Sequence, residues 1–255
     1  LHMVGDPDGA PAMAGTGTGD VLTGTNGLAA IAAALYHRER TGVGQHVSTA
    51  LVDSHLTTHE MNLEVWSLGE GAEPKRSGPM HPVVGGCGVY RCGDGYVVLA
   101  AANDRQWAGF CRAMGNEALV TDPRFADSTG RSVNRDDANE IVADWLATVG
   151  DRNRAVELLD AEQVPAAPVL SVAEAATHPH NVVTQAVRAI DDPVAGQMTI
   201  PGMPIKMSAF PEEQELVAQS LGADNHDVLA QLLGWDTEAI EAAHQAGVIH
   251  QNPEG

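Results

Sequence analysis

One aspartate of this sequence combines a reactive side chain with a helix start and small neighbours. Asp20 ends the segment GTGTGD at residues 15–20 and precedes an alanine-rich helix expected over residues 21–38. The positive end of a helix dipole favours an ionised carboxylate, and an ionised carboxylate can attack a carbonyl carbon. A simpler role is that of N-cap, in which the side chain accepts backbone N–H bonds. The two roles are compatible, and the sequence alone leaves both open.

The glycines before Asp20 do not form a nucleotide-binding loop. In the dinucleotide fingerprint G-x-G-x-x-G the third glycine would fall at Asp20, and no strand precedes the segment. No GK[ST] follows, so the P-loop is excluded as well.

A second glycine cluster surrounds Cys87. Gly85, Gly86 and Gly88 form either a flexible lead into the next hairpin or a mobile flap whose N–H groups approach a reacting acyl group. The spacing does not decide between them. Cys87 has no assignable histidine partner, so an unreactive thiol is favoured over a nucleophile.

Two histidines four residues apart raise the question of a metal. His55 and His59 share a helix face and Glu60 follows, but the order is not H-E-x-x-H and no third ligand is evident. The segment His178-Pro179-His180 is more typical of a turn. We therefore predict no metal site.

Composition narrows the classes of partner. The 255 residues carry 34 acidic and 14 basic side chains, a formal charge of −20, which disfavours binding to nucleic acid or to an anionic membrane. No apolar run reaches the 18 residues of a membrane helix, and the first residues do not resemble a signal peptide, so a cytoplasmic protein is expected. The odd cysteine count, without a CxxC pair, predicts free thiols at Cys87, Cys92 and Cys111.

Hydrophobic periodicity and turn residues predict an α/β chain. The helix at 21–38 carries apolar residues at helical spacing and is expected to be well buried. A hairpin is expected around Gly93-Asp94-Gly95. The face formed by Trp107, Phe110, Cys111 and Met114 marks a further helix. The other expected elements are a strand at 45–51, helices at 53–68, 133–148, 152–162 and 171–177, an extended piece at 165–170, and closing helices at 224–233 and 237–245.

Two aperiodic stretches suggest boundaries between parts of the chain. Residues 69–82 contain Gly, Pro and charge without periodicity, and the chain from residue 178 to the closing helices is rich in proline and is expected to be mostly loop. The predicted division is therefore 1–70, 71–178 and 179–255, with the last part returning to pack on the first.

Several motifs, in this order, resemble the family III CoA-transferases, which include the formyl-CoA and carnitine CoA-transferases. The matching segments are Gly19-Asp20 followed by Thr23-Gly24, AALYHRERTGVGQHV at 33–47, GDG at 93–95, NDRQW at 103–107, DPRF at 122–125, VPAAPV at 164–169, and the tail at 221–249. The resemblance covers nearly the whole chain, and the stretch RERTGVGQHV is highly specific.

The resemblance implies a fold and a site. Residues 1–70 would be part of a Rossmann-like large domain and residues 71–178 a smaller α/β domain. The family's nucleophile maps onto Asp20, and its glycine flap maps onto Gly85 and Gly86, although Cys87 interrupts the glycines here. The family's N-terminal segment, which supplies most CoA contacts, has no counterpart in this sequence. Three explanations stay open: the segment was lost, it lies on a partner chain, or this polypeptide is a fragment. Interlocked homodimers are typical of the family.

The implied reaction moves CoA from an acyl-CoA to a carboxylic acid through a mixed anhydride and an aspartyl-CoA thioester, with the CoA thioester as substrate and no further cofactor. One alternative is an α-methylacyl-CoA racemase, whose second carboxylate would map near Asp104. The segment at 103–107 is more similar to the transferases. Another alternative is a non-catalytic subunit that binds a partner chain.

Overall fold

The protein is a mixed α/β chain that divides into two compact units, Leu1–Val169 and Leu170–Gly255. A computed structural model describes residues 2–93, 95–209 and 219–250. The three-part division drawn from the sequence remains a prediction. In the described part of the chain, no helix is both long and apolar enough to cross a bilayer.

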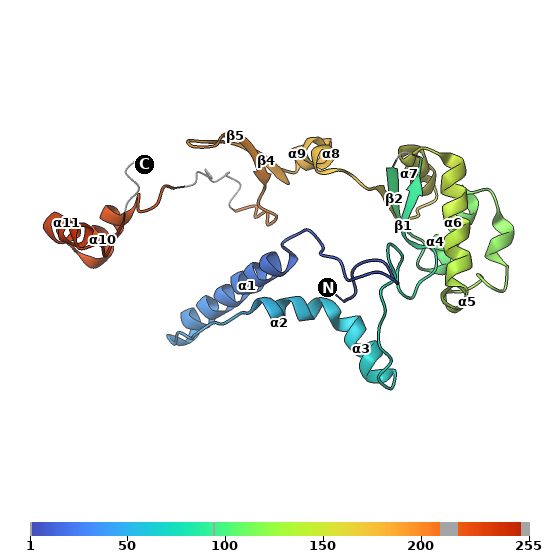
Figure 1. Cartoon of the computed structure of the whole chain (residues 1–255), viewed down its shortest axis with the longest axis horizontal. Coiled ribbons are helices and arrows are strands. Elements are labelled where there is room, and N and C mark those ends of the chain that lie inside the picture. The colour runs from blue at the N-terminus through green and yellow to red at the C-terminus, as the bar shows by residue number, and fades with distance from the viewer. Residues whose placement is uncertain (1, 94, 210–218, 251–255) are drawn as a thin grey trace. The chain divides into compact units, whose positions relative to one another are not determined.

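The first unit begins with a helical segment that carries the predicted nucleophile. Helix α1 spans Thr18–Thr41, and α2 (Leu51–Leu56), the 3₁₀ turn η1 (Thr57–His59) and α3 (Glu60–Leu68) follow. Helices α1 and α2 pack side by side (Figure 1). The Asn26 amide of α1 donates to Oγ of the buried Ser54 of α2 over 3.0 Å. At the end of α1, Gly42 has a φ of 75° and its N–H donates to the Arg38 carbonyl, so this glycine ends the helix.

Two expectations for this segment are wrong. Helix α1 is not buried: Leu28, Ile31 and Leu35 are 52%, 53% and 52% exposed, because the short helix α2 is its main packing partner in this chain. The strand expected at 45–51 is absent, since residues 43–50 have no regular structure and Leu51 already starts α2. Val47 and Thr49 favour a strand, but a strand forms only where another strand pairs with it.

Residues 80–169, which we call the sheet lobe, hold the core of the chain. Strand β1 (Cys87–Cys92) pairs with β2 (Gly95–Ala100), and β2 pairs with β3 (Ala166–Pro168), all antiparallel. In β2, Val97 and Leu99 are buried while the alternate side chains are more exposed, so one face of this sheet meets the core. The predicted hairpin is confirmed.

Helices cover the core side of the sheet. Helix α6 (Arg135–Val149) packs against β1, and α7 (Arg152–Ala161) packs against β2 and β3, as Figure 1 shows. The lobe also holds α4 (Asp104–Ala113), η2 (Glu117–Val120) and α5 (Ser128–Val133). On α4, Trp107 and Phe110 lie 5.4 Å apart between ring centroids and are fully buried. The predicted apolar face of this helix is therefore confirmed.

A single arginine ties the start of the chain to the linker before the sheet lobe. The Arg76 guanidinium donates to the carbonyls of His2, Asp6 and Gly9 over 2.9, 3.0 and 2.7 Å. Three bonds from one fork-shaped side chain fix the geometry of the loop more closely than one bond would.

The second unit contains small elements joined by loops. These are α8 (Val172–Thr177), α9 (Pro179–Val183), β4 (Val187–Asp192), β5 (Gly196–Pro201), α10 (Asn225–Leu233) and α11 (Thr237–Gln245). The closing helices agree with prediction. The expectation of loop after residue 178 is wrong at α9 and at the hairpin β4–β5.

The hairpin is compatible with its prolines because they occupy permitted places. Pro193 lies in the turn, and Pro201 is the last residue of β5. The Asp192 side chain accepts from the N–H groups of Val194 and Ala195, which stabilises the turn. These backbone bonds also lower the pKa of Asp192.

Candidate active site

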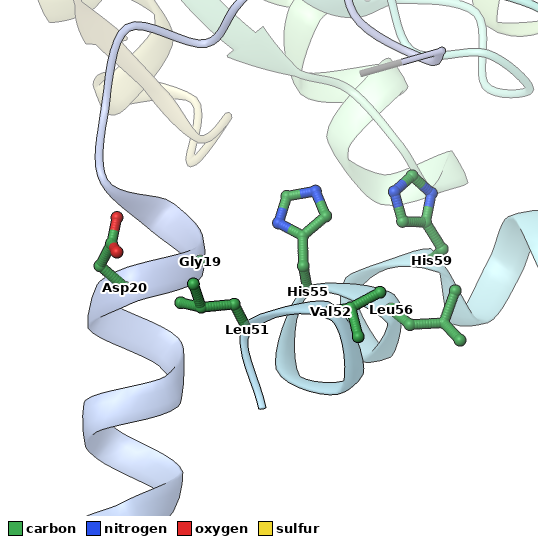
Figure 2. Close-up of a pocket in the computed structure, with 7 residues that line it drawn as sticks. All are labelled: Gly19, Asp20, Leu51, Val52, His55, Leu56 and His59. Atoms are coloured by element: carbon green, nitrogen blue, oxygen red, sulfur yellow. The ribbon is translucent and has the colours of Figure 1, made fainter. Parts of the chain in front are cut away.

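An open cavity of about 430 Å³ lies between the start of α1 and the helices that follow it. Figure 2 shows Asp20 beside Gly19 on α1 and, on the other wall, the two imidazoles above an apolar floor. The seven residues that line it are Gly19, Asp20, Leu51, Val52, His55, Leu56 and His59. The cavity thus joins a carboxylate, two imidazoles and three aliphatic side chains.

Asp20 does not cap its helix. The N-cap of α1 is Gly17, so Asp20 is the third helical residue and stands in the first turn. The helix begins earlier than expected because Thr18 and Gly19 already adopt helical geometry. The position still lies near the positive end of the helix dipole. Its side chain is exposed, and within the described chain it makes no ion pair or hydrogen bond.

Small residues around Asp20 leave room for its carboxylate. A Cβ placed on Gly17 would lie 3.2 Å from Oδ2 of Asp20, so the carboxylate reaches back over the glycine. On the opposite side, a Cβ on Gly19 would lie 3.9 Å from Nδ1 of His55. The absence of side chains at both positions lets a carboxylate and an imidazole approach the same short segment of backbone.

The two histidines are placed by the packing of α2 and η1 against α1. Their rings lie 5.6 Å apart between centroids with planes tilted by 58°, and both residues are half-buried. Nδ1 of His59 lies 3.2 Å from the amide nitrogen of Asn62. Sequence spacing put both histidines on one helix face, but their approach to Asp20 depends on how α2 packs on α1. Among the described residues no group of three or more potential ligands could hold a metal ion.

Gly85 and Gly86 lie in the sheet lobe, and neither lines the cavity beside Asp20. Both are buried, and the Gly86 N–H donates to Oδ1 of Asn139 over 2.9 Å. A Cβ on Gly85 would lie 2.5 Å from the Arg131 carbonyl oxygen. In this arrangement the Gly86 N–H is already bonded, and a flap role would require that bond to open. The flap remains a prediction.

The remaining candidates have structural partners. Burial raises the pKa of the Cys87 thiol, which supports the unreactive interpretation. All three cysteines are buried thiols outside any disulfide, and burial raises the pKa of Cys111 to about 11. Asp104 lies in the first turn of α4 and pairs with the fully buried Arg131 over 2.8 Å. It does not line the cavity that holds Asp20.

The chain matches the model of CoA-transferase family III over residues 1–225. Among curated proteins, it is 37% identical to succinyl-CoA:mesaconate CoA-transferase of Haloarcula hispanica. The alignment of 209 residues covers 82% of this chain and 52% of that protein. It is 32% identical to succinate–glutarate CoA-transferase of Agrobacterium fabrum. The alignment of 237 residues covers 91% of this chain and 58% of that protein. The chain thus spans about half the length of these relatives, which are enzymes.

A solved structure shows the same fold. The CAIB/BAIF family protein from Brucella suis superposes with a TM-score of 0.69 at 27% identity, covering 91% of this chain and 59% of that one. The superposition supports the mixed α/β architecture over part of the longer chain.

Proposed function

This chain belongs to CoA-transferase family III, and on that premise we propose that it moves CoA from an acyl-CoA donor to a carboxylic acid through a covalent intermediate on Asp20. The observation that carries the proposal is the Asp20 carboxylate in the first turn of α1, exposed on the wall of a cavity and without a partner among the residues that the structure describes. A nucleophile must be ionised and accessible, and this position supports both.

In the first half of the proposed reaction, an Asp20 carboxylate oxygen attacks the carbonyl carbon of the acyl-CoA. The carbon–sulfur bond breaks, CoA leaves as a thiolate, and an acyl-aspartyl anhydride remains. The thiolate then attacks the aspartyl carbonyl carbon, which releases the donor acid as a carboxylate and leaves an aspartyl-CoA thioester. The covalent route divides the barrier, since the two acids need not be held at once.

In the second half, the acceptor carboxylate attacks the aspartyl thioester and displaces the CoA thiolate. The thiolate attacks the acceptor's carbonyl carbon in the new anhydride, forms the product thioester and restores the Asp20 carboxylate. The Gly85–Gly86 flap would approach the oxyanions of these steps if the bond between Gly86 and Asn139 opens. We propose this as a separate element of the mechanism.

The racemase alternative has less support. It needs a second acid/base group beside the first, and the Asp104 carboxylate is paired with Arg131 instead of facing Asp20. The relatives described above are also named as transferases.

The first prediction tests the nucleophile. Replacing Asp20 by asparagine keeps the size of the side chain but removes the anion, so transfer should fall by several orders of magnitude. Stability should change by about 1 kcal/mol or less, because the side chain is exposed. Steady-state kinetics and urea unfolding measure the two effects, in a preparation that contains every part of the family fold.

A matched control is Asp53→Asn. Asp53 also lies in a first helical turn, that of α2, but does not line the cavity, so this variant should keep its activity. Hydroxylamine added during turnover should tag the peptide that contains Asp20, and mass spectrometry detects the tag. A fully active Asp20→Asn enzyme, with no tag on that peptide, would refute the nucleophile; exchange of the substrate α-proton would favour the racemase.

A further inference from the structure

The cavity beside Asp20 contains two imidazoles that the proposed reaction does not use. Asp20 is the only side chain that takes part in the covalent steps of the scheme, and His55 and His59 supply the other polar side chains of the lining. Both rings rise from the helices next to Asp20 above an aliphatic floor (Figure 2). Because the two imidazoles lie in the same cavity as Asp20, we ask which part of a substrate they could bind.

Asn62 occupies one ring nitrogen of His59. Its amide group lies 3.2 Å from Nδ1, so Nε2 is the ring nitrogen left to meet a ligand. His59 donates to that ligand when Nε2 carries a proton.

The lining also shows what kind of ligand would need these donors. It contains one carboxylate, Asp20, and no lysine or arginine. A monocarboxylic acid would bring its single carboxyl group to Asp20 for reaction and leave its alkyl chain against Leu51, Val52 and Leu56. A dicarboxylic acid brings a second negative charge near Asp20, and that charge requires hydrogen-bond donors in the same cavity.

We propose that His55 and His59 bind the second carboxylate of a dicarboxylic acid substrate while its first carboxyl group reacts at Asp20. The inference rests on the proposed function and names the substrate class of that site. Ring centroids 5.6 Å apart, with tilted planes, let two N–H groups converge on one carboxylate from different directions. The aliphatic floor contacts the methylene groups between the two ends.

The test compares two five-carbon acceptors that differ in the second carboxylate, glutarate and pentanoate, with succinyl-CoA as donor. In a covalent exchange, kcat/KM for the acceptor is independent of the donor half-reaction, so the ratio of the two kcat/KM values isolates acceptor recognition. Loss of hydrogen bonds to a charged group should lower the glutarate-to-pentanoate ratio by about 10- to 100-fold in the double variant His55→Leu/His59→Leu.

Two further variants sharpen the result. The double glutamine variant keeps N–H donors and should retain more of the preference than the leucine variant. His37→Leu replaces an exposed histidine of α1 that does not line the cavity, and its ratio should match that of the unmodified enzyme. If the leucine variant transfers to neither acid, calorimetric binding of glutarate and pentanoate replaces the kinetic ratio, with the same expected loss.

An unchanged ratio in the leucine variant would overturn the inference while leaving the role of Asp20 intact. A higher KM for acyl-CoA, with the acceptor ratio unchanged, would assign the imidazoles to a phosphate of CoA and also overturn it. Failure of the unmodified enzyme to transfer to either acid, together with no tag on the Asp20 peptide, would instead overturn the proposed function and this inference with it.

Discussion

The buried amide of Asn139 connects three parts of the sheet lobe. Its Oδ1 accepts from the Gly86 N–H and from the Tyr90 hydroxyl, each over 2.9 Å. Asn139 lies on α6, Tyr90 on β1 and Gly86 just before β1, so one oxygen holds the glycine segment against a helix. A buried acceptor shared by two donors is costly to remove, because both donors then lose their partner.

We predict that Asn139→Leu lowers the free energy of unfolding by about 2–5 kcal/mol, since two buried donors lose their acceptor. Tyr90→Phe is the matched control: it removes one donor, leaves the bond from Gly86 in place, and should cost about 1 kcal/mol. Urea unfolding of the two variants measures both values. An Asn139→Leu loss no larger than that of Tyr90→Phe would show that Asn139 is not a shared anchor.

At the residue scale, the sequence predicts which side chains could do chemistry better than it predicts which side chains lie next to them in space. The resemblance and the helix start pointed to Asp20, but its place in the first turn depended on where the helix begins, and a shift of three residues changes a cap into a helical residue. The i, i+4 spacing of His55 and His59 is visible in the sequence, but there it suggests only a possible metal site and gives no link to Asp20. Their relation to Asp20 arises from tertiary packing of α2 on α1, which spacing does not contain.

At the scale of elements, the β1–β2 hairpin depends on a glycine in close contact with another loop. Gly93 has a φ of 58°, and a Cβ there would collide with the Gly150 carbonyl oxygen. Gly150 itself ends α6 with a φ of 67°. The hairpin therefore meets the end of this helix backbone to backbone, and no other residue type fits at position 93.

We predict that Gly93→Ala destabilises the protein by about 1–3 kcal/mol more than Gly115→Ala does. Gly115 has a similar φ of 75° but open space around it, so its alanine variant bears only the backbone strain of about 1–2 kcal/mol. The difference between the two variants in urea unfolding isolates the collision. Equal losses would mean that the loop at Gly150 moves aside at little cost.

The elements predicted correctly are those whose signals are local. The helices α4, α6, α7, α10 and α11 follow apolar periodicity, and β1–β2 follows a glycine turn between apolar runs. The strand expected at 45–51 was wrong because pairing is not local. The hairpin β4–β5 was missed because its prolines were interpreted as loop, although the segment Asp192-Pro193-Val194-Ala195-Gly196 is a turn signal between two strand-like runs.

At the scale of the whole molecule, α1 exposes much of its apolar surface. Leu28, Ile31 and Leu35 are about half exposed, and Met61 and Trp66 of α3 are similarly open. Exposed apolar surface on neighbouring helices favours association. The net charge of −20 opposes it by repulsion between copies, and salt screens that repulsion.

We therefore expect at least a dimer, with association strengthened by raising the salt concentration. Ile31→Glu/Leu35→Glu should weaken it, because the substitutions place charge on the exposed face of α1. Val194→Glu, in the turn between β4 and β5, is the control and should leave the mass unchanged. Static light scattering measures the mass, and a monomer at micromolar concentration in both low and high salt would contradict the prediction.

The three hydrogen bonds of Arg76 bring two distant points of the chain, the loop at residues 2–9 and residue 76, together in space. Since this guanidinium holds the carbonyls of His2, Asp6 and Gly9, the chain leaves the loop at residue 9, forms α1, α2 and α3, and returns to the same loop at residue 76. Residues 10–75 thus resemble an inserted module whose two ends are adjacent in space. A short peptide joining residue 9 to residue 76 would remove α1, α2 and α3 and leave the sheet lobe with the loop that Arg76 holds, for separate study by NMR.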